Sequence, residues 1–124
     1  MNTEDRDFGV QPLDTVLDGW TLTNHQVVEI SPEQLTHKQV QRARTGRKLT
    51  LKMKQKLARS VNFAIWGRLT NEEREAYVEY FPKHLFSYNK GYDAQAGDPN
   101  KERLVDLSER EVRRDFLREL GIES

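Results

Sequence analysis

The segment that decides the fold runs from Gln34 to Asn71 and reads QLTHKQVQRARTGRKLTLKMKQKLARSVNFAIWGRLTN. In its second half, apolar residues recur at the spacing of one face of an α-helix. Thr50 precedes this stretch as a candidate N-cap, and Gly67 follows it as a stop. The pattern predicts a long amphipathic helix between these two residues. Its predicted inward stripe is Met53, Leu57, Val61, Ala64 and Ile65.

The first half of the segment predicts a shorter helix. Thr36 is a candidate N-cap, and Gly46 follows Thr45 as a candidate left-handed residue at the C-terminal end. Val40 and Ala43 are expected to face inward. Because the other residues of this helix are polar or basic, one face of it is expected to remain in solvent.

Upstream of this segment the signals are shorter. Residues 1–10 begin with a polar and acidic stretch and are expected to form a flexible tail. Residues 12–17 predict one short helix or strand. Thr23 is a candidate cap for a short helix that the pair Ser31-Pro32 brings to an end.

Downstream, residues 70–73 (TNEE) form a capping-box pattern and predict a helix that carries Tyr77 and Tyr80. Residues 81–92 are rich in aromatic side chains and predict a turn-bearing segment packed on the helices. Residues 93–124 predict a loop and a C-terminal amphipathic helix packed on the domain. Together these signals predict an all-α fold of five to six helices. Its predicted core is Val40, Leu57, Val61, Ile65, Tyr77 and Phe86.

Charge is strongly segregated along the chain. The 124 residues include twenty Lys or Arg and twenty Asp or Glu, so the formal net charge is zero. Residues 34–71 nevertheless hold ten of the basic residues and none of the acidic ones. The chain is therefore predicted to carry a basic patch on an acidic body, and such a patch attracts polyanions.

Composition also limits the possible sites and compartments. The absence of cysteine excludes disulfides and thiolate metal sites and favours a reducing compartment. No apolar run approaches the ~20 residues that span a bilayer, and the N-terminus lacks the pattern of a signal peptide. We expect a cytoplasmic protein without a cofactor. His25, His37 and His84 lie far apart in the sequence without a partner at metal-ligand spacing, so we expect no metal site.

The order of a short helix, a break, a second short helix, a glycine and a longer amphipathic helix is that of a helix-turn-helix module. Residues 35–50 (LTHKQVQRARTGRKLT) resemble the recognition helix and following turn of the Cro/C1 (XRE) family of DNA-binding proteins. Residues 57–62 (LARSVN) are similar to the next helix of that family. Gln34 stands where the family usually has Gly, and Arg44 replaces a common Glu. The resemblance implies a helix-turn-helix-like domain over residues 11–92.

The resemblance also implies which residues contact double-stranded DNA. The groove-facing side of the recognition helix would be Thr36, His37, Lys38, Gln39, Gln41 and Arg42. The chemistry agrees, because Gln pairs with adenine and Arg or Lys pairs with guanine at major-groove edges. Basic residues around the turn would meet phosphates, and these are Arg44, Arg47, Lys48 and Lys52. The implied function is that of a transcriptional regulator or an accessory DNA-binding protein.

Other interpretations of the same residues stay open. The basic segment is also compatible with RNA or ribosome association, with an acidic protein partner, or with a solvated face. No P-loop, nucleophile elbow, dinucleotide fingerprint or zinc-protease motif occurs, so we do not expect an enzyme. Trp20 and Trp66 are interpreted as core anchors. A monomer is favoured because the terminal helix, residues 109–120, can pack on its own chain, although that helix also offers a dimer contact.

Overall fold

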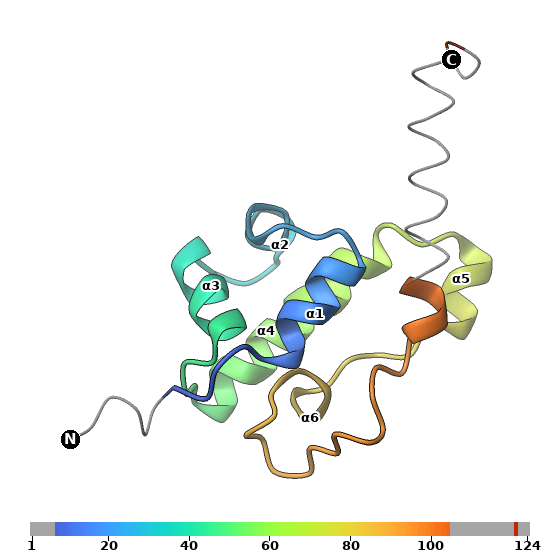
Figure 1. Ribbon diagram of the computed structural model, residues 1–124. Coiled ribbons are helices and arrows are strands. Elements are labelled where there is room, and N and C mark those ends of the chain that lie inside the picture. The colour runs from blue at the N-terminus through green and yellow to red at the C-terminus, as the bar shows by residue number, and fades with distance from the viewer. Residues whose placement is uncertain (1–6, 105–120, 122–124) are drawn as a thin grey trace.

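A computed structural model describes residues 7–104 and 121 of the chain. Within residues 7–104, the only β-type backbone pairing is an isolated antiparallel bridge between Asp7 and Arg47. The predicted all-α fold is confirmed. The labelled helices are α1 (Pro12–Gly19), α2 (Asn24–Ile30), α3 (His37–Thr45), α4 (Leu51–Trp66), α5 (Asn71–Ala76) and α6 (Pro82–Leu85) (Figure 1).

The helix starts predicted from threonine are confirmed. The side-chain oxygens of Thr23, Thr36, Thr50 and Thr70 each accept a hydrogen bond from the backbone N–H three residues further on. At α2, α3 and α5 the side chain at that third position also accepts from the N–H of the cap, which closes a capping box. Gly46 ends α3 in the predicted left-handed conformation, with a φ of 107°. These local signals therefore fix where the helices begin and where α3 ends.

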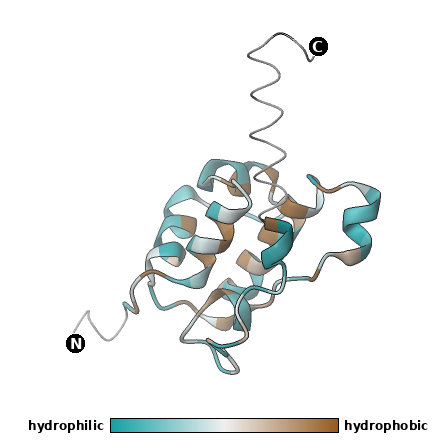
Figure 2. Cartoon of the chain, turned by 45° about the vertical axis from the view of Figure 1, so that its right-hand side comes forward, coloured by the Kyte–Doolittle hydropathy of each residue, from teal (hydrophilic) through white to brown (hydrophobic). Residues whose placement is uncertain are grey.

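The core is built around α4, which passes behind α1 in Figure 1 and contacts α2 and α6. Hydrophobic residues gather where the helices face one another (Figure 2). Trp20 is fully buried, and its indole N–H donates to the Tyr80 hydroxyl at 3.0 Å. Tyr77 is only half-buried but packs against this core. The other predicted core residues are buried, namely Val40, Leu57, Val61, Ile65 and Phe86.

Two predictions about the end of α4 and the chain that follows it are wrong. The helix expected to carry Tyr77 and Tyr80 ends at Ala76, and Tyr77 is extended. The cause is Asn62 on α4. Its amide donates to the Tyr80 carbonyl at 2.8 Å, and its side-chain oxygen accepts from the Tyr80 N–H at 2.8 Å and from the Tyr77 hydroxyl. Trp66, expected in the core, is 45% exposed, because it lies at the end of α4, where its ring contacts Tyr77 edge to face and the Arg74 guanidinium lies over it.

Residues 7–10 were predicted to belong to a flexible tail, but they lie against the end of α3. The Phe8 N–H donates to the Gly46 carbonyl at 2.8 Å. The Phe8 ring stacks on Tyr88 with 4.5 Å between the ring centroids. This segment is therefore part of the folded domain. The predicted C-terminal helix, residues 109–120, and the dimer contact considered for it lie outside the described residues.

Candidate nucleic-acid interface

The connection between α2 and α3, residues 31–36, is held against α4. The Ser31 and Ser60 hydroxyl oxygens lie 2.7 Å apart. The Arg59 guanidinium donates to both carboxylate oxygens of Glu33, at 2.6 and 3.1 Å. These contacts fix α3 relative to α4. The connection is longer than the three- to four-residue turn typical of a helix-turn-helix, so that module stays a prediction.

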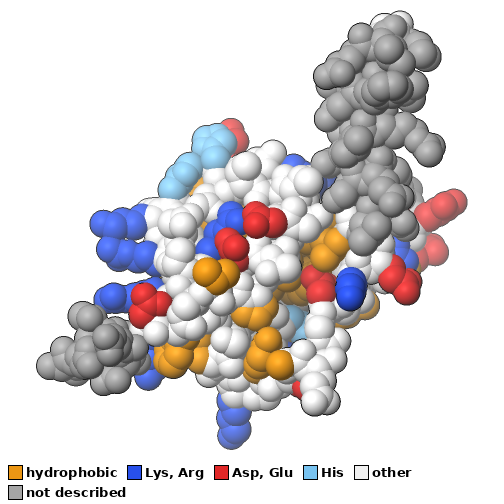
Figure 3. Space-filling model, in the orientation of Figure 1, with side chains coloured by type: hydrophobic (Ala, Val, Ile, Leu, Met, Phe, Trp, Pro, Cys, Tyr) orange, Lys and Arg blue, Asp and Glu red, His pale blue; other side chains and the backbone are white. Residues whose placement is uncertain are grey.

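α3 presents a polar ridge to solvent. Val40 and Ala43 are buried as predicted, so the opposite side of the helix faces outward. Lys and Arg side chains project at the edge of the molecule where α3 lies, and histidines lie close to them (Figure 3). We call this exposed set the α3 ridge. It consists of His37, Lys38, Gln41, Arg42 and Thr45.

Two residues predicted to contact bases form the start of α3 instead. The Thr36 hydroxyl oxygen accepts from the Gln39 N–H at 3.1 Å. The Gln39 side-chain oxygen accepts from the Thr36 N–H at 2.9 Å. Both side-chain oxygens are therefore engaged in the capping box. Thr36 and Gln39 therefore cap the N-terminal end of α3.

Arg44, predicted to contact phosphate, does not join the exposed basic residues and is paired within the protein. Its side chain is only 12% exposed. Its Nε donates to Asp14 at 2.6 Å, and its Nη2 donates to Asp18 at 2.6 Å. Its Nη1 donates to the side-chain oxygen of Asn24 at 2.8 Å. The guanidinium thus ties α3 to α1 and α2, because two carboxylates and an amide surround it.

The turn after α3 and the start of α4 carry the other residues predicted to meet phosphates. Arg47 and Lys48 are exposed in the turn, and Lys52 is exposed at the start of α4. The hydroxyl of Tyr88 holds the turn, since it donates to the Arg47 carbonyl at 3.1 Å and accepts from the Leu49 N–H at 3.1 Å. Burial raises the pKa of Tyr88, which keeps the hydroxyl protonated. Arg47 and Lys48 therefore project from a turn of defined shape, and Lys52 follows in the first turn of α4.

The ten basic residues of segment 34–71 thus fall into two groups. Lys54 is buried and donates to Asn89 at 2.6 Å, and burial lowers its pKa. Arg59 is paired with a glutamate, Arg68 donates to a backbone carbonyl at 2.8 Å, and Lys56 is half-buried. No carboxylate of residues 7–104 pairs with the remaining exposed cations. We call these the basic surface, which consists of Lys38, Arg42, Arg47, Lys48 and Lys52.

His25 and His37 lie far apart in the sequence but side by side in the structure. They stand at the N-terminal ends of α2 and α3, with 5.2 Å between their ring centroids. Packing of the two helices brings them together, and their spacing in sequence gives no sign of it. The His25 Nε2 also lies 3.2 Å from a Glu29 carboxylate oxygen. Among the described residues, no three His, Cys, Asp or Glu side chains are grouped to hold a metal ion.

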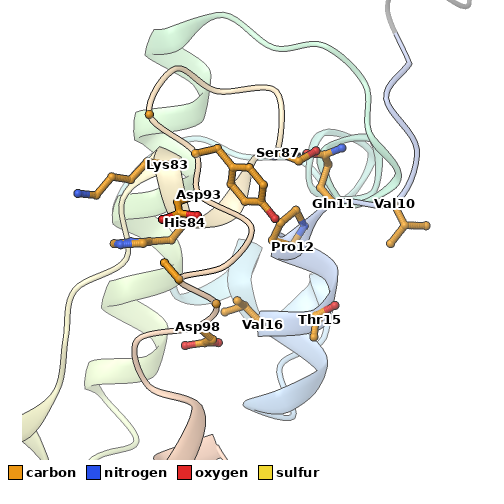
Figure 4. Close-up of a pocket in the computed structure, with 14 residues that line it drawn as sticks. Val10, Gln11, Pro12, Thr15, Val16, Lys83, His84, Ser87, Asp93 and Asp98 are labelled. Carbon is orange, nitrogen blue, oxygen red and sulfur yellow. Dashed lines mark hydrogen bonds between the residues drawn. The ribbon is translucent and has the colours of Figure 1, made fainter.

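A pocket of about 660 Å³ opens between the start of α1, α6 and residues 91–98 (Figure 4). Its polar groups hold the chain around it. The Nδ1 of His84 accepts from the Phe81 N–H at 2.9 Å, and Asp98 accepts from a buried tyrosine hydroxyl at 2.6 Å. Burial lowers the pKa of His84, and Lys83 acts in the same direction. None of the lining residues belongs to α3 or α4, so this pocket is separate from the basic surface.

Comparisons with known proteins find no match. No protein-family model, no curated protein and no solved structure matches this chain. Within the part of the chain that the structure describes, no helix is both long enough and apolar enough to cross a membrane. The function is therefore inferred from the residues and contacts described above.

Proposed function

We propose that this protein binds double-stranded DNA by inserting α3 into the major groove, as a transcriptional regulator or an accessory DNA-binding protein. The observation that carries the proposal is the polar α3 ridge, which continues into a basic surface without carboxylate partners among the described residues. Such a ridge supplies hydrogen-bonding groups for base edges. The flanking cations supply the phosphate contacts that position a helix on the duplex.

The two parts of the surface have different roles in this proposal. Lys38 and Arg42 are four residues apart on α3, so both lie on the outer side of the helix and reach base edges. Arg47 and Lys48 in the turn after α3, and Lys52 at the start of α4, reach phosphates on the backbone beside the groove. The N-terminal end of α4 supports the second role, because free backbone N–H groups there favour a phosphate.

Duplex DNA suits this surface better than RNA does. The major groove of B-DNA is wide enough to admit a helix, whereas the major groove of A-form RNA is deep and narrow. Proteins that recognise unpaired RNA usually stack bases on aromatic rings, and residues 34–52 contain no Phe, Tyr or Trp. An acidic protein partner would need only the cations, whereas base recognition also requires amide and other hydrogen-bonding groups such as those on the α3 ridge.

A competition experiment tests the proposal. The intact protein is bound to a labelled random duplex at moderate salt, and unlabelled duplex DNA or structured RNA is added as competitor. DNA is expected to compete better. The double variant Lys38→Glu/Arg42→Glu should abolish binding, because it reverses two charges of the α3 ridge.

The matched control is Lys83→Glu/Lys101→Glu, which reverses two exposed charges outside the basic surface. It should retain at least a third of the wild-type affinity. Equal losses in the two double variants would mean that net charge, and not this surface, determines binding. Tighter binding of the RNA competitor would mean that RNA, and not DNA, is the partner. The absence of any nucleic-acid binding would favour an acidic protein partner.

A further inference from the structure

The contacts around Arg44 extend to a residue on the α3 ridge. Arg44 donates to Asp14 and Asp18 on α1 and to the side-chain oxygen of Asn24 on α2. The Asn24 amide nitrogen in turn donates to the side-chain oxygen of Gln41 at 2.7 Å. A continuous series of hydrogen bonds therefore runs from two fixed carboxylates to an exposed glutamine.

The chemistry of Arg44 fixes the direction of every bond in this series. A guanidinium has only donors, so the group of Asn24 that faces it must be the carbonyl oxygen. The Asn24 NH₂ group then faces Gln41 and requires an acceptor there. Gln41 must therefore turn its oxygen toward Asn24. Its own NH₂ group has no partner among the described residues and stays available on the α3 ridge.

We propose that Asn24, held by Arg44, orients the Gln41 amide so that Gln41 reads a keto base, guanine or thymine, in the major groove. This inference rests on the DNA binding proposed above. Guanine presents the acceptors O6 and N7 in that groove, and thymine presents the acceptor O4. A glutamine NH₂ group pairs with these acceptors. Asn24 acts here as a positioning residue and does not itself contact the base.

The same geometry makes adenine the less favourable base. Glutamine recognises adenine through two bonds, in which its NH₂ group donates to N7 and its oxygen accepts from N6. Because Gln41 turns its oxygen toward Asn24 and its NH₂ group outward, the oxygen does not face the base, and the N6 amino group beside N7 meets a second donor instead of an acceptor. The adenine pairing that residue type alone suggests for Gln41 is therefore replaced by a preference for an acceptor.

A single substitution should reverse this preference. In Asn24→Asp, both carboxylate oxygens are acceptors, so one still receives the Arg44 hydrogen bond and the other requires a donor from Gln41. The Gln41 amide must then rotate and turn its oxygen outward. An outward acceptor pairs with the amino groups of adenine N6 or cytosine N4. The variant is expected to fold, because an acidic residue is favourable in the first turn of a helix such as α2.

The test is selection of binding sites from a randomised duplex library by the full chain. Wild type, Asn24→Asp, Gln41→Glu and Gln41→Ala are compared, and thermal unfolding shows that each variant is folded. Wild type should select G or T at one position, roughly fivefold or more over A or C. Gln41→Ala should lose the preference at that position only. Asn24→Asp should select A or C there, as should Gln41→Glu, which places an acceptor directly.

The outcomes separate this inference from the proposed function. If wild type binds no duplex, the proposed function fails. If wild type binds but selects adenine at the position that depends on Gln41, or has no such position, the orientation proposed for Gln41 is wrong. If Gln41→Glu changes the selected base and a folded Asn24→Asp does not, Asn24 has no positioning role.

Discussion

Replacing Gly46 with alanine should destabilise the protein far more than the same replacement at Gly91. Both glycines have positive φ, 107° and 88°, so in each case an L-residue is forced into a left-handed conformation. That strain amounts to about 1–2 kcal/mol at either position. Only Gly46 adds a collision, because a Cβ there would lie 1.9 Å from the Gly9 carbonyl oxygen, whereas a Cβ at Gly91 meets nothing within 4 Å.

The size of the extra loss follows from what must move. To relieve the collision, the segment before α1 must leave the end of α3. This breaks the hydrogen bonds from Phe8 to Gly46 and from Gln11 to Arg44, each worth about 0.5–1.5 kcal/mol. It also separates the stacked rings of Phe8 and Tyr88, worth about 0.5–1.5 kcal/mol. The free energy of unfolding should therefore fall by about 3–6 kcal/mol in Gly46→Ala and by about 1–2 kcal/mol in Gly91→Ala.

Urea unfolding followed by circular dichroism measures both variants under the same conditions. The expected result is a much lower midpoint for Gly46→Ala and a slightly lower one for Gly91→Ala, with similar slopes. Equal losses in the two variants would refute the reasoning, because they would mean that the N-terminal segment does not press on Gly46. The turn that carries Arg47 and Lys48 would then not be supported by the segment before α1.

Three further predictions follow from individual side chains. Arg42→Ala should weaken binding to a preferred duplex by about 1–3 kcal/mol and weaken binding to random duplex less, whereas Lys52→Ala should weaken both alike; equal effects on every sequence would contradict the division between base and phosphate contacts. Arg44→Met should lower the free energy of unfolding by about 1–3 kcal/mol in urea, because it leaves carboxylates without their partner, and no loss of stability would rule out its structural role. Because burial lowers the pKa of His84 in the folded protein, its neutral form stabilises the fold above the unfolded pKa of about 6.5, and that stability is lost as pH falls through the folded pKa. Urea midpoints between pH 7.5 and pH 5 should therefore fall more for wild type than for His84→Asn, and parallel curves would contradict the assigned burial.

Features that depend on a few adjacent residues could be predicted from the sequence. Thr36 and Gly46 bound α3 as expected, because a cap needs only its own side chain and a left-handed end needs only a glycine. The stripe on α4 was predicted correctly for Leu57, Val61 and Ile65, which are all buried. These features are local, and no distant partner competes with them.

Features that depend on distant partners could not be predicted. Arginine commonly binds phosphate, so the residue type of Arg44 suggested that role. Its actual partners, Asp14 and Asp18, lie 30 and 26 residues upstream. α5 ends early because Asn62 bonds the chain around Tyr80, 18 residues away. In each case a polar side chain found a partner through packing, and helix periodicity carries no information on such pairs.

The candidate site was partly predictable for the same reason. Exposure of Lys38 and Arg42 follows from the inward position of Val40, which the sequence indicates. The role of Asn24 had no local signal, because it depends on contacts among three helices. Residue type alone suggested adenine for Gln41, and only the hydrogen bond that Asn24 donates to its oxygen changes that expectation.

The central claim is that the basic surface binds the phosphates of a duplex. The most direct measurement is the affinity for random duplex DNA as a function of salt, because each phosphate contact adds about −0.9 to the log–log slope. With three to five contacts from the basic surface, wild type should give a slope of about −3 to −4.5. Lys48→Ala/Lys52→Ala should flatten it by about 2. A wild-type slope flatter than about −1, or an unchanged slope in this double variant, would contradict the account.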